Sequence, residues 1–121
     1  MSDYDLKKIE RIIKALSDKN RIRIINLLKA KQKLCVCEIT SIIGLSQPTI
    51  SSHLKLLENA GLVESQKKGL WVNYNICSRL DRFSSRLIEI IHNYLEKDQQ
   101  IVHDLKKLKK INRIMICRKR S

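Results

Sequence analysis

The sequence predicts a mainly α-helical chain that carries one small β-hairpin. Apolar residues recur every three or four positions through most of its 121 residues, which is the periodicity of helices with one buried face. Only residues 62–76 change to a shorter, strand-like pattern. The three glycines and the single proline fall at the boundaries of the predicted elements. Because aromatic residues are only 4% of a chain that is 43% hydrophobic, we expect an aliphatic core, which suits helix packing.

Three helices are expected in the first part of the chain. Apolar spacing predicts the first over residues 6–16, and Ser17 is the predicted N-cap of the second. A polar connection follows at 29–33, and residues 34–45 predict a short third helix with one buried face. Gly44 is expected to end this helix in a left-handed conformation, which costs other residues more.

A fourth helix and a hairpin follow directly. Ser46 is expected to cap the helix, and Pro48 fits its first turn, where no intrahelical N–H is needed. Gly61 is expected to end it. Residues 62–65 and 71–76 then predict two strands, which are joined by a turn that contains two lysines and a glycine.

The rest of the chain is predicted to be helical, since no glycine or proline follows Cys77. Apolar stripes over 80–94 and 101–111 indicate two helical segments with a polar stretch between them. The final segment, 105–121, holds eight basic residues and no acidic one. We therefore expect one domain over residues 1–104, followed by a basic C-terminal helix or tail over residues 105–121.

The formal net charge of +13 favours a polyanionic partner, usually nucleic acid, over a merely solubilising surface or a membrane-surface helix. No apolar stretch approaches the length of a transmembrane span, and the first ten residues lack the apolar region of a signal peptide. We therefore expect a cytoplasmic protein whose four cysteines are reduced thiols. Without a Gly-rich phosphate loop, a nucleophile elbow or a recognisable acidic pair, the sequence does not predict an enzyme.

A short helix, a glycine turn, a capped second helix and a basic hairpin together predict a helix-turn-helix with a wing. The second helix can place its N-terminal end in the major groove, while the wing tip contacts phosphate or the minor groove. Glutamine can read adenine, and hydroxyl groups suit bases or phosphates. His53 is explained equally well as a surface hydrogen bonder, and we expect Trp71 and Tyr74 to pack the wing. The predicted DNA-contacting residues are Ser46, Gln47, Thr49, Ile50, Ser52, His53, Lys55, Lys67 and Lys68.

Four segments occur in order: LCVCEI at 34–39, SQPTISSHLKLL at 46–57, AGLV at 60–63 and GLWVNY at 69–74. This succession resembles the ArsR/SmtB family of winged-helix repressors, and the arsenical-resistance operon repressors in particular. The resemblance implies a homodimer that binds double-stranded operator DNA and leaves it when an inducer binds. It also implies that the N- and C-terminal helices form the dimer interface. Two recognition helices would then meet successive major grooves about 34 Å apart.

Cys35 and Cys37 are the predicted inducer ligands, because thiolates select soft ions. Arsenite or antimonite is the expected inducer, with Cd, Pb or Zn as alternatives, and a nearby helix N-terminus would lower a thiol pKa. In the resembling arsenical repressors a third cysteine follows three residues later, where this chain has Thr40. Cys77 and Cys117 are weaker candidates for a third ligand.

Other interpretations of the sequence stay open. The cysteine pair is also consistent with structural thiols or with a thiol-redox or persulfide sensor on the same scaffold. The basic tail is also consistent with a constitutive architectural DNA- or RNA-binding protein. His92 and His103 have the spacing of zinc sites in related sensors, but Ile90 and Lys106 stand where the carboxylate partners would be. We therefore do not expect a zinc site there.

Overall fold

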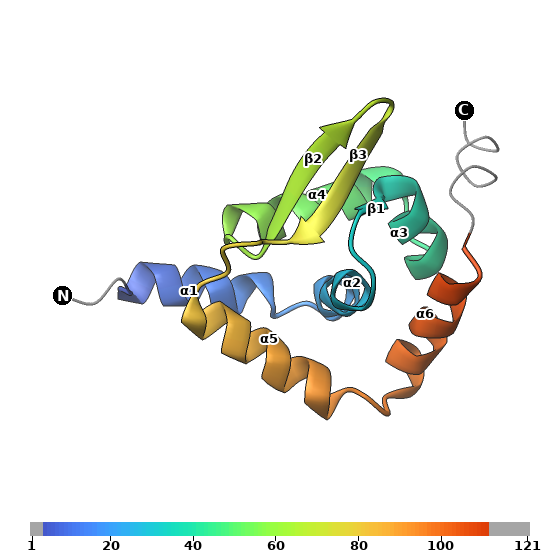
Figure 1. Cartoon of the computed structure of the whole chain (residues 1–121). Helices are drawn as coiled ribbons and strands as arrows, with labels where there is room; N and C mark the ends of the chain where they lie inside the picture. Colours follow the sequence, from blue (N-terminus) through green and yellow to red (C-terminus); the bar gives the residue numbers. More distant parts are fainter. Residues whose placement is uncertain (1–3, 112–121) are drawn as a thin grey trace.

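The structure is a computed structural model and describes residues 4–111. Within this range it is mainly helical with one small antiparallel sheet, as predicted (Figure 1). The helices are α1 (Leu6–Ala15), α2 (Lys19–Ala30), α3 (Val36–Ile43), α4 (Gln47–Asn59), α5 (Arg82–Tyr94) and α6 (Gln99–Lys109). The strands are β1 (Leu34–Cys35), β2 (Val63–Lys68) and β3 (Trp71–Ile76). No helix in the described part is long and apolar enough to cross a membrane.

Side-chain caps explain where most of these helices begin. An aspartate carboxylate accepts a backbone N–H from the first turn of α1, α2, α5 and α6. These aspartates are Asp5, Asp18, Asp81 and Asp98. The prediction that Ser17 caps α2 is wrong. Its hydroxyl instead donates to the Lys14 carbonyl, 2.7 Å away, at the end of α1. The carboxylate of the next residue, Asp18, is the stronger acceptor and caps α2.

The sheet has a third strand that the sequence pattern did not predict. Leu34 and Cys35 are extended and pair with Tyr74 and Asn73 of β3, so the strand order is β1-β3-β2. The predicted helix at 34–45 therefore begins only at Val36. A two-residue strand has too little periodicity to be read from sequence, and its partner lies far along the chain. β1 ties the start of α3 directly to the hairpin.

The hairpin is longer than predicted. β2 pairs with β3 from Val63 opposite Ile76 to Lys68 opposite Trp71. Only Gly69 and Leu70 remain for the turn, and Gly69 has the positive φ (59°) that such tight turns favour. The hairpin projects beyond the helices as a wing (Figure 1).

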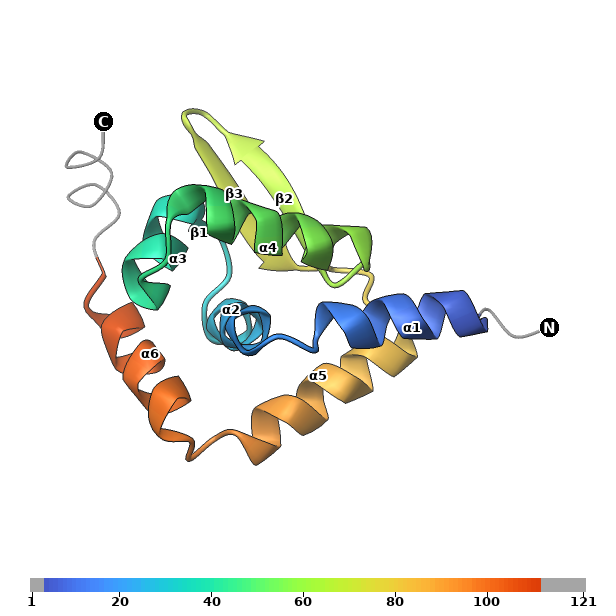
Figure 2. The same cartoon turned by 180° about the vertical axis from the view of Figure 1, so that it is seen from behind.

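α2 lies at the centre of the molecule and is seen nearly end-on in Figures 1 and 2. Four of its apolar side chains are at most 2% exposed, and the buried faces of α1, α3 and α4 join the same aliphatic core. α5 and α6 lie on the side of α2 away from the wing (Figure 2). The four buried apolar side chains of α2 are those of Ile24, Ile25, Leu27 and Leu28. Burial of the whole aliphatic core, of which these side chains are the centre, stabilises the fold.

α6 crosses the domain boundary expected between residues 104 and 105. Leu108 is 6% exposed and packs in the core, so the segment up to the end of α6 belongs to the domain. Asp104 is 1% exposed and accepts two hydrogen bonds from the Arg23 guanidinium of α2, from Nε at 2.8 Å and Nη2 at 2.9 Å. The Lys107 ammonium donates to the Ile42 carbonyl in the last turn of α3 at 3.4 Å. α6 therefore contacts both α2 and the C-terminal end of α3.

Candidate nucleic-acid interface and thiol pair

α3 and α4 form the helix-turn-helix, and the turn between them has the predicted geometry. Gly44 ends α3 with φ 84°, a left-handed conformation that glycine adopts without steric cost. The Ser46 hydroxyl caps α4 by accepting the Thr49 N–H at 3.3 Å, and it lies 2.8 Å from the Thr49 hydroxyl. Pro48 occupies the first turn. The N-terminal end of α4 is therefore held in a defined conformation, with its hydroxyl groups exposed.

One predicted DNA contact is wrong. Ile50 has no exposed surface and lies in the core, because it shares the inner face of α4 with Leu54 and Leu57 at helical spacing. It therefore positions the helix and cannot reach a base. The other predicted residues of the helix N-terminus lie on the solvent side and are exposed. They are Ser46, Gln47, Thr49, Ser52 and Lys55.

His53 is half-buried and contacts Arg21 of α2, with 3.1 Å between its Nδ1 and the Arg21 Nη1. The Arg21 guanidinium also donates to two carbonyls at the end of α1, from Nε to Ala15 at 2.8 Å and from Nη2 to Lys14 at 3.3 Å. Because arginine only donates, this contact is a hydrogen bond in the tautomer whose Nδ1 accepts. No local sequence pattern predicts this contact, because the two residues are 32 positions apart in the chain.

The wing carries the remaining predicted DNA contacts. Lys67 and Lys68 are exposed and lie in β2, next to the tip rather than within the turn. Leu70 at the tip is 96% exposed. Tyr74 packs against the core, and its burial, together with the nearby Glu58 carboxylate, raises the pKa of its phenol. The wing thus presents basic side chains near its tip and an apolar base.

The predicted thiol ligands lie at the start of α3. Cys35 is 4% exposed and is the N-cap residue, and its backbone N–H donates to the Glu38 carboxylate at 3.0 Å. Cys37 lies in the first turn and is half-buried. Thr40, at the place of the third cysteine, is buried and donates its hydroxyl proton to the Val36 carbonyl at 2.6 Å. Its oxygen is thus engaged within the helix.

The weaker ligand candidates lie elsewhere. Cys77 follows β3 and is half-buried, and burial with the nearby Glu64 and Glu58 carboxylates raises the pKa of its thiol. Cys117 lies outside the described residues. His92 lies 3.1 Å through Nδ1 from the side-chain oxygen of Asn26, whereas His103 is exposed on α6. Residues 4–111 contain no cluster of three or more His, Cys, Asp or Glu side chains placed to hold a metal ion.

Comparison with known proteins agrees with this geometry. Residues 18–65, from the cap of α2 into β2, match the family described as "Bacterial regulatory protein, arsR family". The arsenical resistance operon repressor of Escherichia coli (strain K12) is 37% identical over 95 residues, which are 78% of this chain and 81% of that protein. The chain belongs to the ArsR family. It is accordingly a DNA-binding transcriptional regulator and not an enzyme.

Two further proteins, one compared by sequence and one by structure, are similar to this ArsR-family regulator. A cadmium resistance transcriptional regulatory protein of Listeria innocua is 40% identical over 76 residues, which are 63% of this chain and 64% of that protein. A solution structure of Mb0332 from Mycobacterium bovis, a homodimeric winged helix-turn-helix DNA-binding domain, has a TM-score of 0.64 and 25% identity. The match covers 80% of this chain and 92% of that one.

Proposed function

We propose that the protein is a homodimeric repressor that leaves its operator when a thiophilic ion binds Cys35 and Cys37. The single observation that carries this proposal is the position of the two thiols. They lie where β1 ends and α3 begins, so one short segment connects the wing to the helix packed against α4. A ligand at this segment acts on both DNA-contacting elements together.

The exposed face at the start of α4 is proposed to enter the major groove, with Gln47 and Thr49 reading bases. Lys67 and Lys68 of the wing are proposed to contact phosphates. His53 is proposed to take part through its Nε2, since its Nδ1 contacts Arg21. This division explains why the polar residues at the start of α4 are exposed while its apolar stripe is buried.

The dimer is proposed to form through α1 and α5. Four large apolar side chains on these helices are 51–87% exposed, and an exposed apolar surface of this kind marks an interface. They are Leu6, Ile13, Ile90 and Tyr94. Tyr4, just before α1, makes an edge-on ring contact with Phe83 in the first turn of α5, so the N-terminal ends of the two helices lie together. The homodimeric state of the Mb0332 domain supports a dimer.

The inducer is proposed to be arsenite or antimonite, with Cd, Pb or Zn as alternatives. Relatives named for arsenical and cadmium resistance support this class of ion, and thiolates prefer it. Cys35 must leave its buried position to bind, which pulls on both β1 and the first turn of α3. The described residues provide two thiols here, so water, a small thiol or another cysteine, with Cys117 and Cys77 as candidates, completes the coordination.

The test follows release of a fluorescent duplex from the region upstream of the protein's own gene. Reduced protein is titrated with arsenite, antimonite, Cd, Pb, Zn and a persulfide donor while anisotropy is recorded. The Cys35→Ser/Cys37→Ser variant is compared with the wild type, and Cys77→Ser and Cys117→Ser each test one candidate third ligand. We expect arsenite to release the wild type but not the double variant. A single variant that no longer responds identifies its cysteine as the third ligand, and release of both single variants leaves water or a small thiol in that place.

Other outcomes assign the alternatives. Release by oxidant or persulfide alone would establish a thiol-redox sensor on the same scaffold. Tight binding that no reagent reverses, with equal affinity for scrambled DNA, would indicate a constitutive architectural protein. In that case neutralising the basic tail would weaken binding more than changing Gln47 and Thr49.

A further inference from the structure

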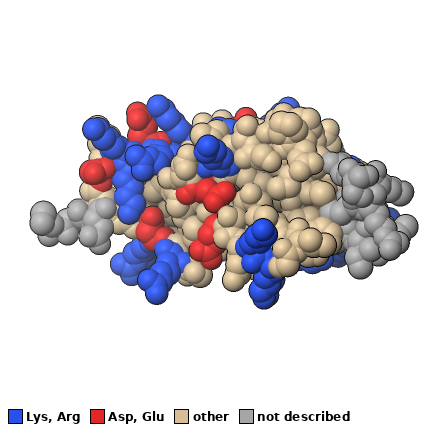
Figure 3. All heavy atoms as spheres, turned by 90° about the horizontal axis from the view of Figure 1, so that it is seen from above, with Lys and Arg blue, Asp and Glu red and all other residues tan. Residues whose placement is uncertain are grey.

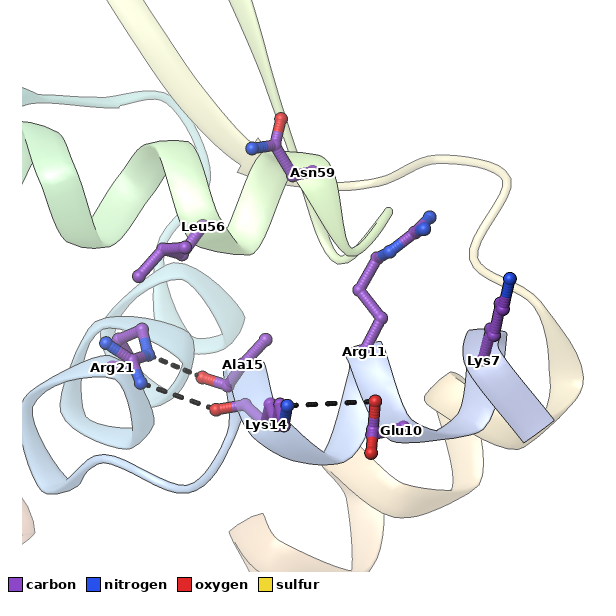
Figure 4. A pocket seen from close by; sticks show the side chains of 8 residues that line it. All are labelled: Lys7, Glu10, Arg11, Lys14, Ala15, Arg21, Leu56 and Asn59. Carbon is purple, nitrogen blue, oxygen red and sulfur yellow. Dashed lines mark hydrogen bonds and ion pairs between the residues drawn. The ribbon is translucent and has the colours of Figure 1, made fainter.

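A basic hollow of about 560 Å³ lies between α1 and the C-terminal half of α4, outside every residue assigned above to DNA (Figure 4). We propose that this hollow holds backbone phosphates of the bound DNA and so extends the interface beyond α4 and the wing. The proposal rests on the DNA-binding geometry proposed above. The residues that carry it are Lys7, Arg11 and Lys14 of α1, Arg21 of α2, and Leu56 and Asn59 of α4.

α1 has three distinct faces, and only one of them borders the hollow. Ile12 and Ala15 are buried in the core, and Leu6 and Ile13 form the exposed apolar face proposed for the dimer. The third face carries Lys7, Arg11 and Lys14, spaced by four and three residues, so they lie in one row. Lys7 and Arg11 rise from α1 toward the end of α4 (Figure 4). The row is therefore separate from both the core and the proposed dimer contact.

The hollow keeps a net positive charge after its own contacts are counted. Glu10 is its one lining carboxylate, and it pairs with Lys14 at 3.7 Å. Arg21 is held by carbonyl groups, which do not cancel its charge. Lys7 and Arg11 form no ion pair with another described residue. Lysine and arginine side chains gather at this end of the molecule when it is viewed from above, with a few acidic ones among them (Figure 3).

The hollow continues the exposed face of α4. Thr49, Ser52, Leu56 and Asn59 are all exposed and recur at helical spacing, so they form one stripe. At a rise of 1.5 Å per residue, Asn59 lies roughly 15 Å beyond Thr49 along the helix. The major groove is about 12 Å wide. With the start of α4 in the groove, the sugar-phosphate strand at the groove edge therefore runs past Asn59, where Lys7 and Arg11 meet it.

Phosphate contacts have a measurable signature, because each one lost lowers the slope of log affinity against log salt by about 0.9. The experiment uses Lys7→Gln/Arg11→Gln and, as matched control, Lys97→Gln/Lys106→Gln. The control removes the same charge from exposed sites around the α5–α6 turn, far from α4. Both variants and the wild type are titrated at several salt concentrations onto the upstream duplex and a scrambled duplex of equal composition.

We expect Lys7→Gln/Arg11→Gln to lower the slope of log affinity against log salt by about 2, equally on both duplexes, while the control keeps the wild-type slope. The charge-conserving variant Lys7→Arg/Arg11→Lys should keep it as well. A slope of Lys7→Gln/Arg11→Gln that equals the slope of the control overturns the proposal. So does a loss of affinity that follows dissociation of the dimer in sedimentation, or a charge-conserving variant that behaves like the neutral one.

The two proposals fail in different ways. If the wild type does not prefer the upstream duplex over the scrambled one, the operator-binding function is at fault. The slope on scrambled DNA still tests the hollow in that case, because phosphate contacts carry no sequence information.

Discussion

The two helices of the helix-turn-helix, α3 and α4, begin in different ways. α4 begins at Ser46, whose hydroxyl accepts a backbone N–H of the first turn, which is a common and durable cap. α3 begins at Cys35, and the carboxylate of Glu38 reaches back to the Cys35 N–H. A sulfur at the cap is a weak acceptor but a strong ligand for soft ions. The helix proposed to read DNA is thus capped by a hydroxyl group, whereas the helix proposed to sense the inducer begins at a thiol that can bind a soft ion.

The largest expected effect concerns the C-terminal end of α3, which Lys107 of α6 contacts. Asp104→Ala leaves the nearly buried Arg23 guanidinium without its carboxylate, so we expect a loss of about 3 kcal/mol in the free energy of unfolding. Urea denaturation measures this, with Glu89→Ala at an exposed site of α5 as control. Amide exchange should rise more in α3 than in α4. Equal exchange in both helices would contradict a dependence of α3 on α6.

Removing the Glu38 side chain tests the start of α3. Glu38→Ala leaves the buried Cys35 N–H without its acceptor, which we expect to cost about 1–3 kcal/mol. If the first turn of α3 couples inducer to DNA, the variant should also bind the upstream duplex more weakly in the absence of inducer. Stability is measured by urea denaturation and affinity by anisotropy. A stable variant with unchanged affinity would show that this first turn does not matter for DNA binding.

The matching change in α4 should cost less. Ser46→Ala removes the cap of α4 and the contact to the Thr49 hydroxyl, and we expect a loss of about 1 kcal/mol. Ser46→Asp keeps a cap and should restore stability, but its charge should weaken DNA binding. Thermal unfolding and anisotropy separate the two effects. If alanine leaves stability unchanged, the cap does not stabilise α4.

The smallest effect is expected at a charged cap. Asp18 is partly buried, which raises its pKa, but hydrogen bonds from the backbone N–H groups of Arg21 and Asn20 outweigh this, so its pKa lies below the ordinary value. Its contribution to stability is therefore complete above the unfolded-state pKa of about 3.9 and is lost as the pH falls through the lower folded-state value. The stability difference between wild type and Asp18→Asn should stay constant above about pH 5 and shrink as the pH falls below about 4. A difference that stays constant over the whole range would contradict this.

The sequence predicted those parts of the molecule that depend on neighbouring residues. Ser46, Pro48 and Gly44 each act within one turn, and the α4 boundaries and the wing strands followed from such signals. The strand β1, the contact between Arg21 and His53 and the docking of α6 join residues that are far apart, so no local pattern contains them. Ile50 stands among polar residues in the sequence, but its helical spacing to Leu54 and Leu57 places it on the buried face of α4 and not among the DNA contacts. The thiol pair could be located but not its coordination, since Thr40 leaves the third ligand open.

Among residues 4–111, the strand order leaves β2 at an edge of the sheet, where the outer side of its backbone pairs with no other strand of that range. Such an edge can recruit a strand from another molecule, and charged side chains are a usual protection against this. Glu64, Lys67 and Lys68 are exposed along it. The two lysines proposed to contact phosphates therefore also keep the free protein from associating edge to edge. Neutralising them should cost solubility as well as affinity, so loss of binding in such variants must be compared at equal concentrations of dispersed protein.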